Sequence, residues 1–160
     1  MTGTPKPATI LLVDDEEMVL TSLKSFLALE TEYRAIPFLS PGQALSYARG
    51  NEVNLVISDF LMPEMDGISF LARMRELRPD ATRIILTGYA DKENAIKAIN
   101  EVGIFQYIEK PWDNDQLLIA IRNGLEKQRM LKNLEEKIAE INKAYADLSR
   151  IQQEILKTFA

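Results

Sequence analysis

The sequence contains no cysteine and no histidine among its 160 residues. These two absences exclude disulfide bonds, thiolate zinc sites, and any reaction that needs a cysteine nucleophile or a histidine base within this chain. The groups that remain for chemistry are carboxylates, hydroxyls and amines. A lack of cysteine is typical of cytoplasmic proteins, and we expect this location.

Long hydrophobic runs and an excess of positive charge are also missing. No apolar stretch approaches the roughly 20 residues that a membrane-spanning helix needs. Residues 1–7 are not followed by the apolar core of a signal peptide, so we expect a short flexible leader and no membrane contact. With 24 acidic and 19 basic residues, the net charge of −5 disfavours direct binding to nucleic acid.

Short apolar runs alternate with amphipathic stretches up to about residue 112, within a composition that is 46% hydrophobic. Five runs are predicted as β-strands, over residues 8–13, 33–38, 53–58, 83–86 and 104–108. The stretches between them have helical spacing, the first through Met18, Leu20, Leu23, Phe26 and Leu27. This alternation predicts an α/β fold whose parallel sheet is covered by helices on both faces.

Polar residues stand where the predicted strands end. Asp14 and Asp15 follow the first strand, and Asp59 follows the third. Thr87 follows the fourth strand directly, and Lys110 comes just after the fifth. Because ligands of parallel α/β sheets bind at the carboxyl ends of the strands, we expect these side chains to share one edge. Three crowded carboxylates repel one another unless a hard cation binds among them, and Mg²⁺ is the natural candidate.

Carboxylates, a hydroxyl and an ammonium group placed together in this way can carry out phosphoryl transfer. A carboxylate beside a divalent cation can attack a phosphoryl group and form an acyl phosphate, while the cation and an ammonium group stabilise the transferred oxygens. Thr87 could then donate a hydrogen bond to a phosphoryl oxygen. Each residue also has a structural explanation when taken alone, since Asp14 and Asp15 could cap a helix and Lys110 could be a solvated surface charge.

Five short motifs, in this order, resemble the receiver domain of two-component response regulators, a CheY-like family, over residues 8 to about 125. The motifs are Leu12-Val13-Asp14-Asp15, Ser58-Asp59-Phe60-Leu61-Met62-Pro63, Asp66-Gly67, Leu86-Thr87-Gly88-Tyr89-Ala90 and Lys110-Pro111-Trp112. The resemblance implies a doubly wound, flavodoxin-like sheet with strand order 2-1-3-4-5. It also implies a cognate sensor histidine kinase as partner and a cis bond between Lys110 and Pro111.

The resemblance further implies a role for each site residue. Asp59 is the expected phosphoacceptor, and it forms the expected catalytic group together with Thr87 and Lys110. The implied Mg²⁺ ligands are Asp14, Asp15, Asp59 and the backbone carbonyl of Leu61. Thr87 and Tyr107 are the expected switch pair, which relays phosphorylation to the surface of the fourth helix, the fifth strand and the last helix. Such a domain catalyses its own phosphorylation and dephosphorylation, and no separate enzyme domain is visible in the sequence.

Beyond residue 125 the pattern changes to that of a coiled coil. Apolar residues are spaced alternately by three and four over about four heptads. The seam consists of Leu131, Leu134, Ile138, Ile141, Tyr145, Leu148, Gln152, Ile155 and Phe159. Gln152 in this seam, with Ile151 beside it, marks a place where two registers could compete. An amphipathic helix that packs back on its own domain is the structural alternative.

These patterns predict a leader over residues 1–7, a receiver domain over 8–124, and a coiled-coil helix over 125–160 that forms a parallel homodimer and controls a missing or separate output domain. Two of the motifs, Leu86-Thr87-Gly88-Tyr89 and Lys110-Pro111-Trp112, resemble those of receivers joined to HD-GYP phosphodiesterases, and cyclase, kinase and phosphatase outputs stay open. Two other functions each account for part of the sequence. An aspartyl phosphohydrolase of the haloacid dehalogenase type would carry a second aspartate where Leu61 stands, and a non-catalytic coiled-coil adaptor would leave the acidic cluster unexplained.

Overall fold

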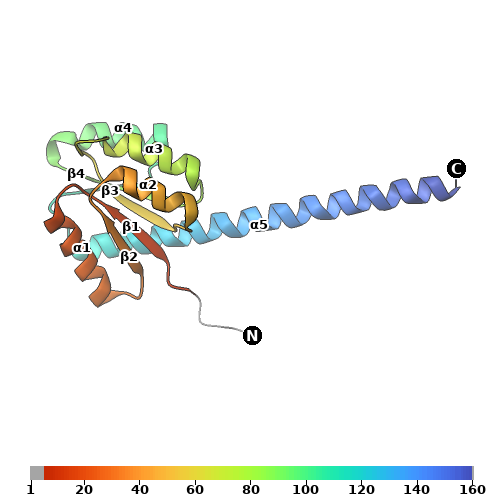
Figure 1. The fold of residues 1–160 in the computed structure, drawn as a ribbon, viewed down its shortest axis with the longest axis horizontal. Helices are drawn as coiled ribbons and strands as arrows, with labels where there is room; N and C mark the ends of the chain where they lie inside the picture. Colours follow the sequence, from red (N-terminus) through yellow and green to blue (C-terminus); the bar gives the residue numbers. More distant parts are fainter. Residues whose placement is uncertain (1–5, 160) are drawn as a thin grey trace. The chain divides into compact units, whose positions relative to one another are not determined.

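The computed structural model describes residues 6–159, apart from the side chain of Tyr89; residues 1–5 of the predicted leader lie outside this range. Five parallel strands form one sheet in the order β2-β1-β3-β4-β5, which confirms the expected fold (Figure 1). The strands are β1 (Thr9–Val13), β2 (Arg34–Phe38), β3 (Leu55–Asp59), β4 (Thr82–Thr87) and β5 (Gln106–Glu109). The helices are α1 (Glu17–Glu30), α2 (Pro41–Gly50), α3 (Gly67–Leu77), α4 (Lys92–Val102) and α5 (Asn114–Phe159), with a 3-10 turn, η1, over Tyr89–Asp91.

Helices cover both faces of the sheet, and its three central strands, β1, β3 and β4, are therefore buried along their whole length. Leu11 and Val13 of β1 belong to the core beneath α2, α3 and α4. Ile10 and Leu12 belong to the opposite core, beneath α1 and the first part of α5 (Figure 1). Alternate residues of one strand therefore supply two separate cores, as the period of a β-strand requires.

Several details differ from the expected pattern. Strand β3 begins two residues later than expected and includes Asp59, because its register with β4 pairs Leu55 with Thr82 and Asp59 with Leu86. In α1 the expected apolar face is buried at Leu20, Leu23 and Leu27, but Met18 is 85% exposed. The bounds of β3 are therefore set by its pairing with β4, which the local apolar pattern does not specify.

The first part of α5 is held tightly against the sheet at Gly124. A Cβ atom at this glycine would lie 2.9 Å from side-chain carbons of both Leu55 and Thr82. The hydroxyl of Thr82 donates a hydrogen bond of 2.6 Å to the carbonyl oxygen of Gly124. Glycine thus permits the close approach that this hydrogen bond needs.

One turn further along α5, the side chain of Gln128 is buried in a polar network. Its Oε1 accepts a hydrogen bond from Nδ2 of Asn54 at 3.2 Å, and its Nε2 donates to Oδ2 of Asp80 at 2.9 Å. Oδ1 of Asn54 in turn accepts from the backbone N–H of Thr9. The starts of β1 and β3, the α3–β4 connection and α5 are joined in this way.

The chain divides into two compact units, Met1–Gln128 and Arg129–Ala160. Over its described residues, the second unit is the C-terminal part of α5. The large apolar side chains of the predicted seam are between 37% and 84% exposed, and Gln152 is exposed as well. Within residues 6–159, no helix combines the length and the hydrophobicity that crossing a membrane requires.

Candidate functional site

Side chains from three strand ends meet at the carboxyl edge of the sheet. Asp14 follows β1, Asp59 is the last residue of β3, and Lys110 follows β5. Next to them lies a cavity of about 350 Å³. Its lining residues are Asp15, Glu16, Asp59, Phe60, Leu61, Gly88, Asp91 and Lys110. The doubly wound topology thus brings together residues as far apart in the sequence as Asp14 and Lys110.

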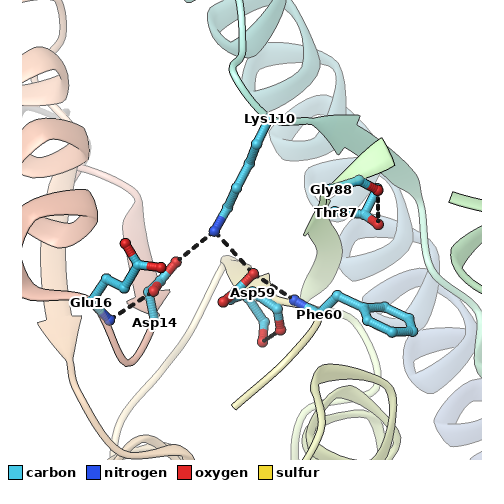
Figure 2. A network of polar contacts seen from close by, with 8 residues as sticks. Asp14, Glu16, Asp59, Phe60, Thr87, Gly88 and Lys110 are labelled. Atoms are coloured by element: carbon cyan, nitrogen blue, oxygen red, sulfur yellow. Dashed lines mark hydrogen bonds and ion pairs between the residues drawn. The ribbon is translucent and has the colours of Figure 1, made fainter. Parts of the chain in front are cut away.

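The ammonium group of Lys110 lies between two carboxylates, as Figure 2 shows. Its Nζ is 3.0 Å from Oδ1 of Asp59 and 3.3 Å from Oδ2 of Asp14. Burial by itself would lower the pKa of Lys110, but the hydrogen bond to Asp59 and the charges of both carboxylates outweigh it and raise the pKa. Lys110 therefore stays protonated at neutral pH and presents a fixed positive charge to the cavity.

Asp14 is almost completely buried. Its pKa is raised mainly by this burial and also by the charge of Asp59, although the backbone N–H of Glu16 and the ammonium of Lys110 oppose the shift. That N–H donates a hydrogen bond of 2.8 Å to Oδ1 of Asp14 (Figure 2). The ionised form of Asp14 is thus only partly compensated by the protein, which favours a further cation at this place.

The residues fit a small hard cation. One carboxylate oxygen from each of Asp14, Asp15 and Asp59 can be chosen so that all three lie within 4.8 Å of one another. Oxygen ligands of this kind are those that Mg²⁺ prefers, and Asp15 is exposed, so that a hydrated ion can approach. Leu61 also lines the cavity, as expected for a residue that would offer its carbonyl oxygen.

The orientation of Asp59 depends on backbone contacts around it. Its Oδ1 accepts a hydrogen bond of 2.9 Å from the N–H of Phe60 (Figure 2). The same N–H also donates to the carbonyl of Leu86. The carbonyl of Phe60 accepts from the N–H of Gly67 at 2.8 Å, so the loop after β3 folds back onto the phosphoacceptor candidate. A Cβ atom at Gly67 would lie 2.1 Å from the carbonyl oxygen of Asp59.

We therefore expect Gly67→Ala to displace Asp59. Because backbone rather than a flexible side chain blocks the methyl group, the variant should lose about 1–3 kcal/mol of unfolding free energy or more, measured by urea denaturation. Gly50→Ala is the matched control, since a Cβ there meets nothing within 4 Å. Equal stabilities of the two variants would contradict the close approach at Gly67.

The two expected switch residues, Thr87 and Tyr107, differ in how deeply they are buried. Thr87 is fully buried, and its hydroxyl donates a hydrogen bond of 3.1 Å to the carbonyl of Gly88. Its own carbonyl accepts from the N–H of Lys110 at 2.9 Å. Tyr107 is half-buried, and Nζ of Lys92 lies 5.9 Å from the centroid of its ring. Among the described residues, neither Thr87 nor Tyr107 belongs to the lining of the acidic cavity.

Two carboxylates at this cavity were missed by the sequence reasoning, those of Glu16 and Asp91. Glu16 directly follows the acidic pair, and Asp91 ends the η1 turn after β4. Asp91 also stands at the N-cap of α4, where its side chain makes no capping hydrogen bond. The expected cis bond between Lys110 and Pro111 is confirmed.

Comparison with known proteins agrees with this geometry. Residues 10–122 match a family model described as the response regulator receiver domain. The hydrogenase transcriptional regulatory protein HoxA of Cupriavidus necator is 37% identical over 123 residues, which are 77% of this chain and 25% of HoxA. The transcriptional regulatory protein GlrR of Escherichia coli is also 37% identical, over 76% of this chain and 27% of GlrR. The chain thus spans about a quarter of the length of these curated relatives.

Solved structures show the same similarity. The signal receiver domain of an HD domain-containing protein from Pseudomonas fluorescens Pf-5 is 42% identical, with a TM-score of 0.73 over 78% of this chain and 99% of that one. A structure described as adenylate cyclase from Rhodopirellula baltica is 27% identical, with a TM-score of 0.78 over 83% of this chain and 98% of that one. The similarity therefore holds for proteins of different stated functions.

Proposed function

Since the chain belongs to the family of response regulator receiver domains, we propose that Asp59 accepts a phosphoryl group from a sensor histidine kinase in the presence of Mg²⁺. The observation that carries this proposal is the position of Lys110, within 3.0 Å of Asp59 and 3.3 Å of Asp14 beside an acidic cavity. An ammonium group there can balance the charge of a phosphoryl group bound to Asp59.

Several residues of the chain have distinct roles in this phosphoryl transfer. A carboxylate oxygen of Asp59 forms a bond to phosphorus as the bond from phosphorus to the donor nitrogen breaks, and the nitrogen leaves with the electron pair. The N–H of Phe60 orients the carboxylate, and Lys110 stabilises the transferred oxygens. Asp14, Asp15 and Asp59 would hold the cation, with the carbonyl of Leu61. Bound Mg²⁺ would neutralise negative charge on the phosphoryl oxygens.

The position two residues after Asp59 argues against a phosphohydrolase. Leu61 stands there at the cavity, and it is 59% exposed. A leucine side chain cannot donate or accept the proton that the acid-base residue of such an enzyme would transfer. We therefore assign to this site the phosphorylation cycle of a receiver.

The proposal extends to the rest of the chain. Residues 8–124 are the receiver, and the helix from residue 125 carries an exposed heptad seam that we assign to a parallel homodimer. A change at the receiver surface formed by α4, β5 and α5 would alter this dimer and thereby an output module. The 42% identity to the receiver of an HD domain-containing protein supports an output of that type, whereas HoxA is a transcriptional regulatory protein.

Incubation with phosphoramidate and Mg²⁺ tests the central step. We expect one phosphoryl group per chain, removed by hydroxylamine as an acyl phosphate is, and located on the peptide that contains Asp59 by mass spectrometry. A stable, hydroxylamine-resistant modification on a serine or threonine would contradict the proposal. Because this test needs no kinase, it separates the chemistry of the site from the identity of the donor.

Metal binding should depend on Asp15. Asp15→Asn replaces a charged oxygen ligand by a neutral amide, so the affinity for Mg²⁺ should fall roughly tenfold or more. The single tryptophan, Trp112, follows Lys110 by two residues and offers a fluorescence signal for the titration. Asp147→Asn, on the exposed C-terminal part of α5, is the control. Unchanged affinity in Asp15→Asn would remove Asp15 from the metal site.

Thr87 is expected to couple phosphorylation to the surface. Thr87→Ala lacks the hydroxyl that would turn from Gly88 to a phosphoryl oxygen, so phosphorylation should persist while the response of α4 and β5 weakens. The measurement is the change in amide hydrogen exchange over residues 89–109 when beryllofluoride is added. The exposed Thr21→Ala serves as control. Identical exchange changes in both variants would count against this route.

A further inference from the structure

The exposed C-terminal part of α5 carries two overlapping apolar seams. Both contain Ile141, Leu148 and Ile155, which are seven residues apart. The first register completes them with Tyr145, Gln152 and Phe159. The second register completes them with Ala144, Ile151 and Thr158. Each set keeps the alternating spacing of three and four that a coiled coil needs.

From Ile141 onward each register has an advantage and a cost. The first buries Tyr145, but it also places the polar Gln152 in the core. The second replaces Gln152 by Ile151, but it places the small Ala144 where the larger Tyr145 would otherwise pack, and Thr158 where Phe159 would pack. Before Ile141 the balance is lost, because the second register would bury Lys137 in place of Ile138. The choice of register therefore lies in residues 141–159.

A second copy of this helix fits the seam in both registers. In the first register the flanking positions from 142 to 158 are uncharged, so identical helices bring no like charges together; these positions are Asn142, Ala144, Ser149, Ile151, Leu156 and Thr158. In the second register the acidic flanking positions are Glu140, Asp147 and Glu154. In a parallel pair they face the other copy's Tyr145, Gln152 and Phe159 positions rather than each other.

Parallel pairing follows from the same charges. An antiparallel pair in the second register would bring the acidic flanks of both copies to the same side of the seam, where like charges repel. In the parallel pair, the phenol of Tyr145 and the amide of Gln152 stand opposite carboxylates and can donate hydrogen bonds to them, and Phe159 brings no charge to its position. The second register is thus compatible with a parallel homodimer.

We propose that residues 141–159 of α5 bind the same segment of a second copy in two alternative registers, and that phosphorylation at Asp59 shifts the balance between these registers. The proposal rests on the dimer assigned under the proposed function. Exchange between registers turns residues 141–159 of each helix by about 50°, half the angle of about 100° between neighbouring residues, while the residues before Ile141 keep the first register. Because Ile141, Leu148 and Ile155 stay in the seam throughout, the dimer persists while its geometry changes.

Single cysteines test both the dimer and the exchange between registers, since the natural chain has no cysteine. Leu148→Cys lies in both seams and should form interchain disulfides under mild oxidation, with and without beryllofluoride. Tyr145→Cys and Gln152→Cys report the first register, and Ala144→Cys and Ile151→Cys report the second. We expect the ratio of cross-linking rates at 151 and 152, and at 144 and 145, to change at least about threefold when beryllofluoride is added. Arg150→Cys, outside both seams, is the negative control.

Each outcome has a definite meaning. If Leu148→Cys does not cross-link in either state, the homodimer of the proposed function is wrong. If it cross-links but the two rate ratios are the same with and without beryllofluoride, the dimer stands and the proposed shift between registers is refuted. The same ratios measured in an Asp59→Asn background should not respond to beryllofluoride, which links the change to the site.

Because a cysteine can itself bias the register, a second variant supports the test. Gln152→Leu removes the polar residue from the first register and should hold the helices there. In this background the ratio of cross-linking at 144 to that at 145 should become low and insensitive to beryllofluoride. A ratio that still responds as in the parent chain would overturn the assignment of Gln152 to the first register, and with it the proposal.

Discussion

Asp59→Asn is expected to abolish phosphorylation, with incorporation from phosphoramidate falling by at least about 100-fold, which corresponds to about 2.7 kcal/mol in the barrier. An amide is a far weaker nucleophile than a carboxylate, and it removes a negative oxygen from the metal site. The fold should survive, since the Oδ1 atom of asparagine can still accept the hydrogen bond from Phe60 and Lys110 keeps its contact with Asp14.

Mass spectrometry of the intact chain measures this effect directly. Asp147→Asn makes the same chemical change on an exposed helix face and should be phosphorylated as the parent chain is. Circular dichroism of both variants excludes unfolding as the cause. If Asp59→Asn incorporated phosphoryl groups at the parental rate, the acceptor would have to be another residue, and the role of the Lys110 contact would need a different explanation.

The double change Ile138→Asp and Ile141→Asp is expected to convert a dimer into a monomer. Both side chains belong to the seam and are about half exposed in the single chain, so they are available to a partner helix. Pairing would bury four carboxylates in the dimer, and each would cost several kcal/mol if it stayed ionised. A penalty of this size exceeds what the remaining apolar contacts of a seam this short can offset.

Analytical ultracentrifugation at tens of micromolar, with and without beryllofluoride, provides the measurement. Ala139→Asp combined with Lys143→Asp is the control, because it places two aspartates on the outer face of the same helix turns. This control should remain dimeric. A parent chain that is monomeric in both conditions would refute the homodimer, and the helix would then have a structural role within one chain.

The site residues could be predicted from the sequence because they stand at the ends of β-strands. Asp14, Thr87 and Lys110 each stand at or just after a predicted apolar run, and a parallel sheet directs all such ends to one edge. The order of strands followed from the resemblance and is confirmed, although no local pattern specifies it. The roles of these residues in binding Mg²⁺ and in phosphoryl transfer stay predictions.

What the sequence determined by itself was the alternation of elements, the two cores and the set of polar residues at the strand ends, because periodic burial is encoded locally. The tertiary structure decided how those residues meet. Only the strand order β1-β3-β4-β5 and the register of these strands bring Lys110 to both Asp14 and Asp59, and only the loop after β3 makes glycine necessary at position 67. Such contacts depend on strand register and crossover packing, which involve residues far apart in the chain.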